Sequence, residues 1–236
     1  MSTAADPRLI VGLDLPSVDA AEAMVERLGE AVSFYKVGLT LLAMPGGVDF
    51  AHRLKAAGKL VFQDWKLHDI GAQVEGAARS VASGGCDLLT VHAHPQVMRG
   101  AVKGRGDAPT KILAVTVLTS LSDADLMEIG YGETAASLVE RRVRQALDCG
   151  VDGVVSSPHE AARARAIATE AGRPDFLVVT PGVRSAGADK GDQQRIATPA
   201  DALTAGASHL VVARPVVAAA DPVAAARAIT AEMAGV

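Results

Sequence analysis

Two hydrophobic periods alternate along the chain from one end to the other. Short runs rich in Val, Ile and Leu are followed by longer segments with apolar residues at helical spacing, as in repeated strand–helix units. The short runs predict eight strands, over Leu9–Leu13, Phe34–Val37, Leu60–Gln63, Leu88–Val91, Ile112–Val117, Gly153–Val155, Phe176–Thr180 and Leu210–Val212. The longer segments predict eight helices, over Val18–Leu28, Val48–Ala57, Ala72–Ser83, Gln96–Val102, Thr134–Asp148, His159–Ala171, Pro199–Ala205 and Pro222–Met233.

The number of these units favours one fold class. Eight pairs in 236 residues give about 30 residues per pair, the size of one βαβ step of a (β/α)8 TIM barrel. An open doubly wound sheet is the alternative, but Gly12–Pro16 lacks the glycine-rich phosphate turn that it requires. No linker divides the chain, so we expect a single α/β barrel domain over residues 1–236.

Composition narrows the classes of protein and partner. Aromatic residues make up 3% of the chain, so small aliphatic side chains must fill the core. The net charge of −4 gives no basic field for nucleic acid or anionic lipid. Cys86 and Cys149 are too far apart for a Cys-x-x-Cys site, and no apolar run is long enough to cross a membrane. We therefore expect a soluble cytoplasmic protein with two buried free thiols.

Charged or titratable residues stand at the ends of the first four predicted strands. The site of a (β/α)8 barrel lies where strands end and βα loops begin, so these side chains are expected to face one mouth. They are Asp14, Lys36, Asp64, Lys66 and His92. For the cluster of Lys36, Asp64, Lys66 and Asp69, solvated ion pairs at the rim are the alternative interpretation, but these residues stand at or just after apolar runs instead of lying on helix faces.

The third strand end carries the densest charge. Asp64 and Lys66 are two positions apart and share one strand face, which is the barrel interior if Gln63 and Trp65 point outward. Asp69 lies five residues past Asp64 and has left the strand. It is placed to serve either its own pocket or that of a neighbouring subunit.

Arginines follow the last two strands. Arg184 ends Thr180–Arg184, and Arg214 follows the eighth strand. The loops after strands seven and eight form the usual phosphate site of this architecture, and arginine adds bidentate hydrogen bonds. Gln193 is a further neutral donor in the intervening loop. Surface arginines without a ligand are the alternative.

His92 and His94 suggest a zinc pair, but neither a third ligand nor a cysteine lies nearby in the sequence. We therefore expect polar packing or hydrogen bonding to substrate, and no metal site.

The segment from Asp64 to Asp69 resembles the Asp-x-Lys-x-x-Asp signature of the orotidine 5′-monophosphate decarboxylase family. Further matches occur in family order and cover essentially the whole chain, at Gly12–Asp14, Lys36–Gly38, Val117–Ser120, Thr180–Arg184, Gly191–Gln193 and Arg214–Pro215. The resemblance implies decarboxylation of orotidine 5′-monophosphate to uridine 5′-monophosphate and CO2 in de novo pyrimidine biosynthesis. It also implies a homodimer, without a cofactor or metal.

The resemblance assigns a role to each matching residue near the reacting atoms. Asp14 and Lys36 would hold the ribose hydroxyls, and Asp64 and Lys66 would face the reacting carbon. Asp69 would reach across the dimer interface into the site of the partner subunit. Lys66, as an ammonium, would stabilise the carbanion left by CO2 and donate a proton to ring carbon 6.

The resemblance also implies contacts to the rest of the nucleotide. Thr119 would contact the pyrimidine, and Val183–Arg195 would form a closing lid. The phosphate contacts would be Arg184, Gln193, the backbone at Ala213, and Arg214.

The sequence departs from the family pattern at two places. Gly71-Ala72-Gln73 stands where the family has Pro-Asn-Thr, and we expect Gln73 to substitute as a donor to the ribose or the interface. Ala213 replaces a glycine, which keeps the N–H and adds a methyl group.

Two other functions are compatible with this fold. Magnesium-dependent sugar-phosphate enzymes resembling 3-keto-gulonate 6-phosphate decarboxylase share the Asp-x-Lys-x-x-Asp motif. They carry a metal-binding glutamate where this chain has Lys36, and they lack the Pro-Gly-Val-Arg loop. A barrel that only binds a ligand is the second alternative, and the intact Lys/Asp array argues against it.

Overall fold

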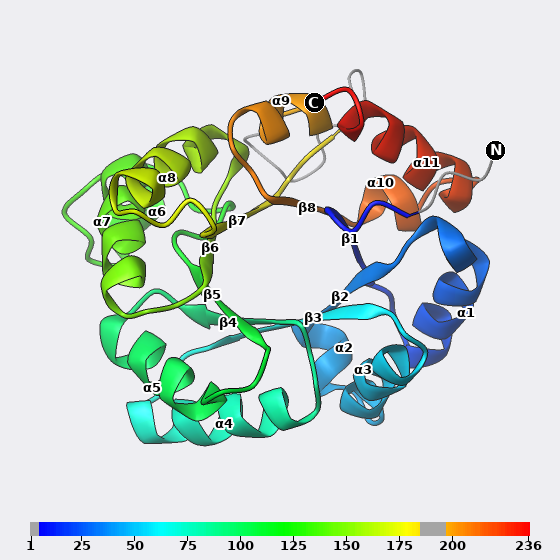
Figure 1. The fold of residues 1–236 in the computed structure, drawn as a ribbon, viewed down its shortest axis with the longest axis horizontal. Coiled ribbons are helices and arrows are strands. Elements are labelled where there is room, and N and C mark those ends of the chain that lie inside the picture. Colours follow the sequence, from blue (N-terminus) through cyan, green and yellow to red (C-terminus); the bar gives the residue numbers. More distant parts are fainter. Residues whose placement is uncertain (1–4, 185–196) are drawn as a thin grey trace.

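The computed structural model describes residues 5–184 and 197–236. Within these ranges, eight parallel strands close into a barrel in chain order, and β1 pairs with β8 to complete the ring. The helices surround the strands on the outside (Figure 1). The closed ring confirms the predicted (β/α)8 barrel and excludes the open doubly wound sheet, which would leave two strand edges unpaired.

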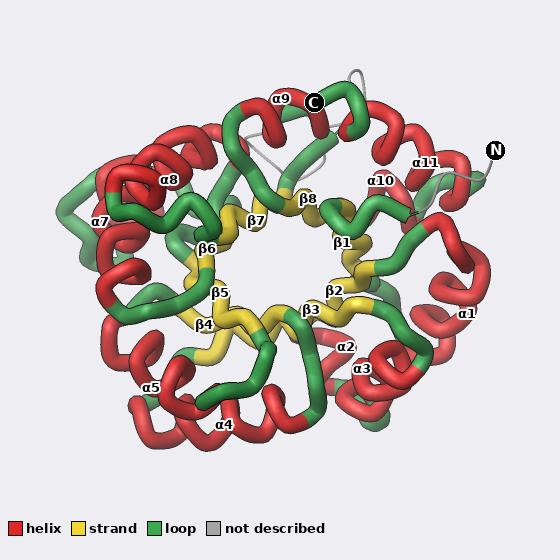
Figure 2. The backbone as a smooth tube through the Cα atoms, in the orientation of Figure 1, coloured by secondary structure: helices red, strands yellow, loops and turns green. Residues whose placement is uncertain are grey.

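The strands form the inner wall seen in Figure 2. They are β1 (Leu9–Gly12), β2 (Phe34–Gly38), β3 (Leu60–Leu67), β4 (Leu88–His92), β5 (Lys111–Val115), β6 (Gly153–Val155), β7 (Leu177–Pro181) and β8 (His209–Val212).

The helices form the outer layer. They are α1 (Val18–Leu28), the 3-10 helix η1 (Gly29–Ala31), α2 (Leu39–Ala43), α3 (Gly47–Ala56), α4 (Gly71–Ser83), α5 (Pro95–Arg105), α6 (Asp123–Glu128), α7 (Ala135–Asp148), α8 (Pro158–Glu170), α9 (Pro199–Thr204), α10 (Arg214–Val217) and α11 (Pro222–Met233).

Helix boundaries follow local sequence chemistry. The side chains of Ser17, Thr134 and Asp221 each accept a hydrogen bond from a backbone N–H three residues later, at the starts of α1, α7 and α11. Proline occupies the first turn of α5, α8, α9 and α11, where a missing N–H costs no helical hydrogen bond.

Small and aliphatic side chains fill the core, as the scarcity of aromatic residues predicts. The barrel interior is filled by a cluster of buried residues, namely Ile10, Phe34, Phe62, Leu88, Leu113, Val179 and Val211. Two larger apolar clusters fill the space between the strands and the helices, and Trp65 packs against both of them. The filled interior leaves the ends of the strands as the place for a site.

The structure differs from the predicted elements most clearly at β3 and at short helices that the pattern did not indicate. β3 continues to Leu67, whereas the predicted strand ends at Gln63. The prediction stops there because Asp64 and Lys66, which point into a cavity, interrupt the apolar pattern of a buried strand. The short helices α2, α6 and α10 were not predicted. Two of them carry a local signal: α6 has a capping box between Ser122 and Asp125, and α10 has a proline in its first turn.

Cys86 and Cys149 are free and buried, in agreement with the expectation from their spacing. Across the two described ranges, no helix combines the length and the apolar character needed to span a bilayer.

Candidate active site

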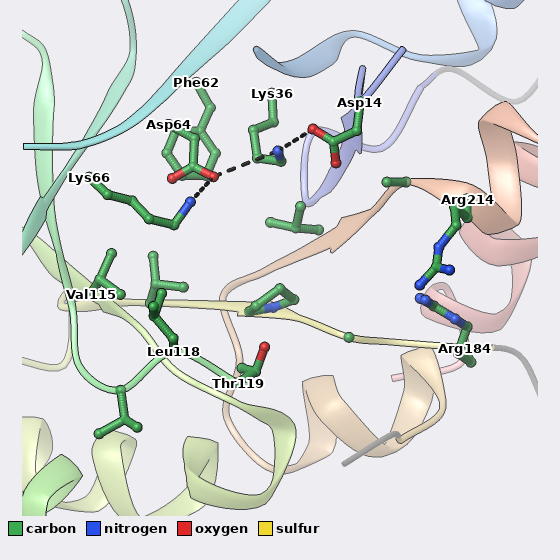
Figure 3. A pocket seen from close by; sticks show the side chains of 16 residues that line it. Asp14, Lys36, Phe62, Asp64, Lys66, Val115, Leu118, Thr119, Arg184 and Arg214 are labelled. Atoms are coloured by element: carbon green, nitrogen blue, oxygen red, sulfur yellow. Dashed lines mark hydrogen bonds and ion pairs between the residues drawn. The ribbon is translucent and has the colours of Figure 1, made fainter. Parts of the chain in front are cut away.

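A cavity of about 430 Å³ opens at the carboxyl ends of the strands (Figure 3). It is lined by Asp14, Lys36, Phe62, Asp64, Lys66, Val115, Val117, Leu118, Thr119, Val155, Pro181, Gly182, Arg184, Val211, Ala213 and Arg214. This is the position at which (β/α)8 barrels carry their sites. The cavity has a charged network at one end, an apolar middle and two arginines at the other end.

The charged network alternates in sign across three neighbouring strands. The Nζ of Lys36 lies 2.9 Å from Asp14 Oδ1 and 3.6 Å from Asp64 Oδ2. The Nζ of Lys66 lies 2.7 Å from the same Asp64 oxygen. Parallel pairing places Gly38 of β2 opposite Asp64 of β3, which brings the two lysines to either side of one carboxylate.

Asp64 is the buried centre of this network. Burial acts to raise the pKa of its carboxyl group, but the charges of Lys36 and Lys66 and the hydrogen bonds from Lys66 and Thr90 outweigh it. The pKa of Asp64 therefore lies below its usual value, and the group is a carboxylate at neutral pH.

Two glycines make room for the network. A Cβ atom on Gly38 would lie 2.7 Å from Asp14 Oδ1 and 3.0 Å from Lys36 Nζ. A Cβ atom on Gly12 would lie 3.1 Å from the methyl carbon of Ala213 and 3.2 Å from Lys36 Cε. In each of the pairs Gly12-x-Asp14 and Lys36-x-Gly38, a glycine therefore stands two positions from a charged residue. The missing side chain of the glycine leaves room for Asp14 and Lys36.

Lys66 lies in an irregular part of β3. Gln63 is opposite Leu89 of β4, and Leu67 is opposite Val91, so four steps on β3 match two steps on β4 and β3 holds two extra residues. Lys66 has a positive φ of 50°. Every other non-glycine residue in the described ranges has a negative φ.

The side chains of β3 still alternate between the two faces through this bulge. Asp64 and Lys66 line the cavity, whereas Gln63 and Trp65 line a separate hollow between the barrel and the helices α3 and α4. The indole N–H of Trp65 donates to Gln63 Oε1 at 2.9 Å on that outer side. This is the arrangement that the two-residue spacing predicts.

Arg184 and Arg214 point toward each other at the opposite end of the cavity (Figure 3). Arg184 is buried, and its Nη1 donates to the carbonyl of Val183 at 2.9 Å. Burial and then the charge of Arg214 lower the pKa of Arg184. Two adjacent guanidinium groups favour an anionic ligand group, because its charge relieves their repulsion.

The middle of the cavity is largely apolar. Phe62, Val115, Val155 and Val211 line it, and Thr119 brings a hydroxyl group to its wall. A flat ring with a few polar atoms suits such a surface. Thr119 is among the residues predicted from the sequence, whereas the apolar lining is not, although the alternation of inward-facing residues along β3, β5, β6 and β8 marks these positions.

Two of the predicted site residues that the structure describes, Asp69 and Gln73, do not line this cavity in the single chain. Asp69 is exposed and accepts a hydrogen bond from the N–H of Ile70 at 2.6 Å, in a neighbouring hollow that His68 and His94 also line. Gln73 is exposed on the first turn of α4. Gln193, like most of the predicted lid, lies outside the described residues.

His92 and His94 belong to a stack of rings. The ring centroid of His68 lies 5.1 Å from that of His92 and 4.5 Å from that of His94. Burial and then the neighbouring His68 lower the pKa of His92 to about 4, so its ring is neutral at pH 7. In residues 5–184 and 197–236, no three His, Cys, Asp or Glu side chains are grouped to hold a metal ion.

Sequence reasoning also missed Thr90. Its side chain is fully buried in β4 and donates to Asp64 Oδ1 at 2.8 Å. A polar residue within the apolar run Leu88–Val91 was the available signal.

Comparisons with known proteins agree with this geometry. The model of the Orotidine 5'-phosphate decarboxylase / HUMPS family matches residues 7–229. An orotidine 5'-phosphate decarboxylase of Caulobacter vibrioides is 69% identical over 232 residues, covering 98% of this chain and 99% of that protein. One from Rhodopseudomonas palustris (strain BisB5) is 58% identical over 234 residues, covering 98% of this chain and 97% of that protein.

Solved structures share the whole fold. The crystal structure of orotidine 5'-phosphate decarboxylase from Lactobacillus acidophilus matches with a TM-score of 0.82 and 35% identity, over 97% of this chain and 99% of that one. An uncharacterized conserved protein from Geobacillus kaustophilus matches with a TM-score of 0.80 and 31% identity, over 95% of this chain and 99% of that one. By sequence and by structure, this chain belongs to the Orotidine 5'-phosphate decarboxylase / HUMPS family.

Proposed function

We propose that this protein decarboxylates orotidine 5′-monophosphate to uridine 5′-monophosphate and CO2, in de novo pyrimidine biosynthesis. The observation that carries the proposal is one cavity with the Lys36–Asp64–Lys66 network at one end and Arg184 and Arg214 at the other. The names of relatives up to 69% identical support the same reaction.

The two ends of the cavity fit the two ends of this nucleotide. Arg184, Arg214, Gln193 and the backbone N–H of Ala213 bind the phosphate in the proposal. Thr119 contacts the pyrimidine, whose faces pack against the apolar middle. Asp14 and Lys36 bind the ribose hydroxyls.

The chemistry takes place beside Asp64 and Lys66. The bond between ring carbon 6 and the carboxylate breaks, CO2 leaves, and the electron pair stays on carbon 6. The Lys66 ammonium stabilises that negative charge, transfers a proton to carbon 6, and takes up a proton from solvent afterwards. No cofactor enters this scheme.

Asp64 raises the energy of the bound substrate. Two carboxylates about 3 Å apart repel each other by roughly 5 kcal/mol at an effective dielectric constant near 20, and the departure of CO2 relieves this repulsion. Binding energy from the distant phosphate offsets the cost and favours closure of the lid.

We propose a homodimer in which Asp69 of the partner subunit completes each network. The position of Asp69 supports this role, because the residue is exposed, lies outside its own cavity and adjoins Ile70, whose exposed fraction is 61%. An exposed Ile at this site is suited to burial by a second copy. Gln73, also exposed nearby, is the interface donor in this dimer. The buried free thiols fit a reducing compartment, the cytoplasm.

Lys36 argues against the magnesium-dependent sugar-phosphate reaction. Its ammonium lies between Asp14 and Asp64 and supplies the positive charge that a divalent cation would otherwise bring to these carboxylates.

An absorbance assay that follows the loss of orotidine monophosphate, with and without EDTA, tests the proposal. We expect the same rate in both samples. No turnover of the nucleotide by the folded protein refutes the function, and activity that EDTA removes and Mg²⁺ restores supports the metal-dependent alternative.

A further inference from the structure

Thr90 connects the two residues at the reacting end of the cavity, although it does not line the cavity itself. Its hydroxyl oxygen accepts a hydrogen bond from the backbone N–H of Lys66 at 3.0 Å. The same hydroxyl group donates to Asp64 Oδ1 at 2.8 Å. One fully buried side chain therefore contacts both the backbone of the lysine and the carboxylate of the aspartate.

The position of Thr90 in β4 explains this double contact. The β3 bulge lies between the pairs Gln63–Leu89 and Leu67–Val91, so Thr90 is the β4 residue opposite the bulge. The hydroxyl oxygen of Thr90 satisfies the N–H of Lys66, whose backbone has the left-handed φ of 50°. A side chain on β4 thus supports a backbone conformation that a β-branched or long side chain rarely adopts.

The direction of the hydroxyl proton follows from these contacts. Because the N–H of Lys66 points at the Thr90 oxygen, the single Thr90 proton is available for Asp64. Oδ1 of Asp64 is then held by Thr90, while Oδ2 faces Lys66 and Lys36. Both oxygens have fixed partners, so the carboxylate has one orientation relative to the Lys66 ammonium.

We propose that Thr90 is a positioning residue, whose hydroxyl group sets the orientation of the Asp64 carboxylate and of the Lys66 backbone for the reaction. This inference rests on the proposed decarboxylase function, and it adds a residue that never touches the nucleotide. The residue acts on the step at carbon 6 and leaves binding of the phosphate and ribose unchanged.

Three variants isolate the hydroxyl group. Thr90→Ser and Thr90→Ala both lose the methyl group and differ from each other only in the hydroxyl, and Thr90→Val keeps the shape without it. We expect kcat close to wild type in Thr90→Ser, and a fall of about 10- to 100-fold in Thr90→Ala and Thr90→Val. The affinity for uridine monophosphate, which has no carboxylate at carbon 6, should stay within about threefold of wild type.

The pH profile separates positioning from general loss of stability. Without the Thr90 donor the Asp64 carboxylate is less stabilised, so the acid limb of kcat/KM should move to higher pH in Thr90→Ala but not in Thr90→Ser. Thr110→Val is the matched control, because the Thr110 hydroxyl donates to the carbonyl of Cys86 at 2.7 Å, is equally buried, and precedes β5 at the other end of the barrel. It should lower the thermal midpoint and leave kcat and the pH profile unchanged.

Two outcomes overturn the inference while the proposed function stands. One is wild-type kcat and pH dependence in folded Thr90→Ala, and the other is equal loss in Thr90→Ser and Thr90→Ala. If the wild-type protein does not turn over the nucleotide, the function fails separately. A ¹³C NMR titration of Asp64 in wild type, Thr90→Ser and Thr90→Ala then decides whether the hydroxyl group sets the ionisation of that carboxylate.

Discussion

The Lys66 ammonium lies 2.7 Å from the carboxylate of Asp64, its neighbour two positions earlier on the same face of β3. The two side chains differ in exposure, because that of Asp64 is 11% exposed whereas that of Lys66 is 32% exposed. The acid is thus fixed in the wall, while the amine extends into the cavity, where a ligand can reach it (Figure 3).

Replacement of this amine should remove catalysis and retain binding. In Lys66→Ala we expect kcat/KM to fall by at least about 10⁴-fold, because both the charge stabilisation and the proton donor are lost. Calorimetric titration should still detect uridine monophosphate, since Arg184 and Arg214 are unchanged. Lys103→Ala, at an exposed lysine on α5, is the control with normal activity. Turnover near wild type in Lys66→Ala contradicts the assigned role.

The shared position of Asp69 can be tested by mixing two inactive variants. Lys66→Ala and Asp69→Ala chains, co-refolded at equal concentration, should regain activity because a heterodimer contains one intact site. Random pairing makes half of the dimers heterodimers, each with one of its two sites intact, so the activity limit is roughly a quarter of wild type. Each variant refolded alone serves as the control. Mixtures that show no more activity than the separate chains place Asp69 in the pocket of its own subunit.

The contact between α4 and α5 should be sensitive to one methyl group. A Cβ atom on Gly104 would lie 2.1 Å from the backbone oxygen of Glu75, so Gly104→Ala forces the helices apart. We expect a loss of about 1–3 kcal/mol in the free energy of unfolding, measured in urea. Gly76→Ala is the matched control on α4, where nothing lies within 4 Å of the added carbon, and it should gain about 0.5–1 kcal/mol. Equal stability of the two variants contradicts the packing argument.

The buried ring of His92 should make stability depend on pH. Burial lowers the pKa of His92 to about 4 in the folded protein, below the ordinary value of 6.5. The unfolded chain therefore binds a proton first as the pH falls, and stability is lost between pH 6.5 and pH 4 by up to about 1.4 kcal/mol per pH unit. Above pH 6.5 this contribution is complete.

Urea titrations of wild type and His92→Gln at pH 7, 6 and 5 measure this effect. The variant should show a shallower fall in the free energy of unfolding over that range. His159→Gln, at an exposed position on α8, should match wild type. The prediction fails if His92→Gln follows the wild-type slope.

Most of the barrel could be predicted from the sequence, because the strand period and the helix period are each set by residues close together in the chain. All eight predicted helices, for example Val18–Leu28, and all eight predicted strands overlap elements of the structure, because both follow from the alternation of short apolar runs with segments of helical spacing. The charged strand ends could be identified for the same reason. Asp64 and Lys66 are two positions apart, and the sidedness of a strand follows from that spacing.

The rest depends on contacts between distant segments. The bulge in β3 is defined by its pairing with β4, and the role of Thr90 depends on that pairing. The space at Gly38 exists for a carboxylate 24 positions earlier, at Asp14. No local pattern reports such relationships.

The parity of the β3 bulge sets a rule for length changes in this strand. Because the insertion comprises an even number of residues, Gln63 before it and Leu67 after it face the same side of β3, where both line the outer hollow. Removing Asp64 alone would invert the sidedness of the residues after it, so that the indole of Trp65 would face the cavity and the ammonium of Lys66 would face the helices. Loss of one residue at the bulge is therefore incompatible with Asp64 and Lys66 on the same face of β3.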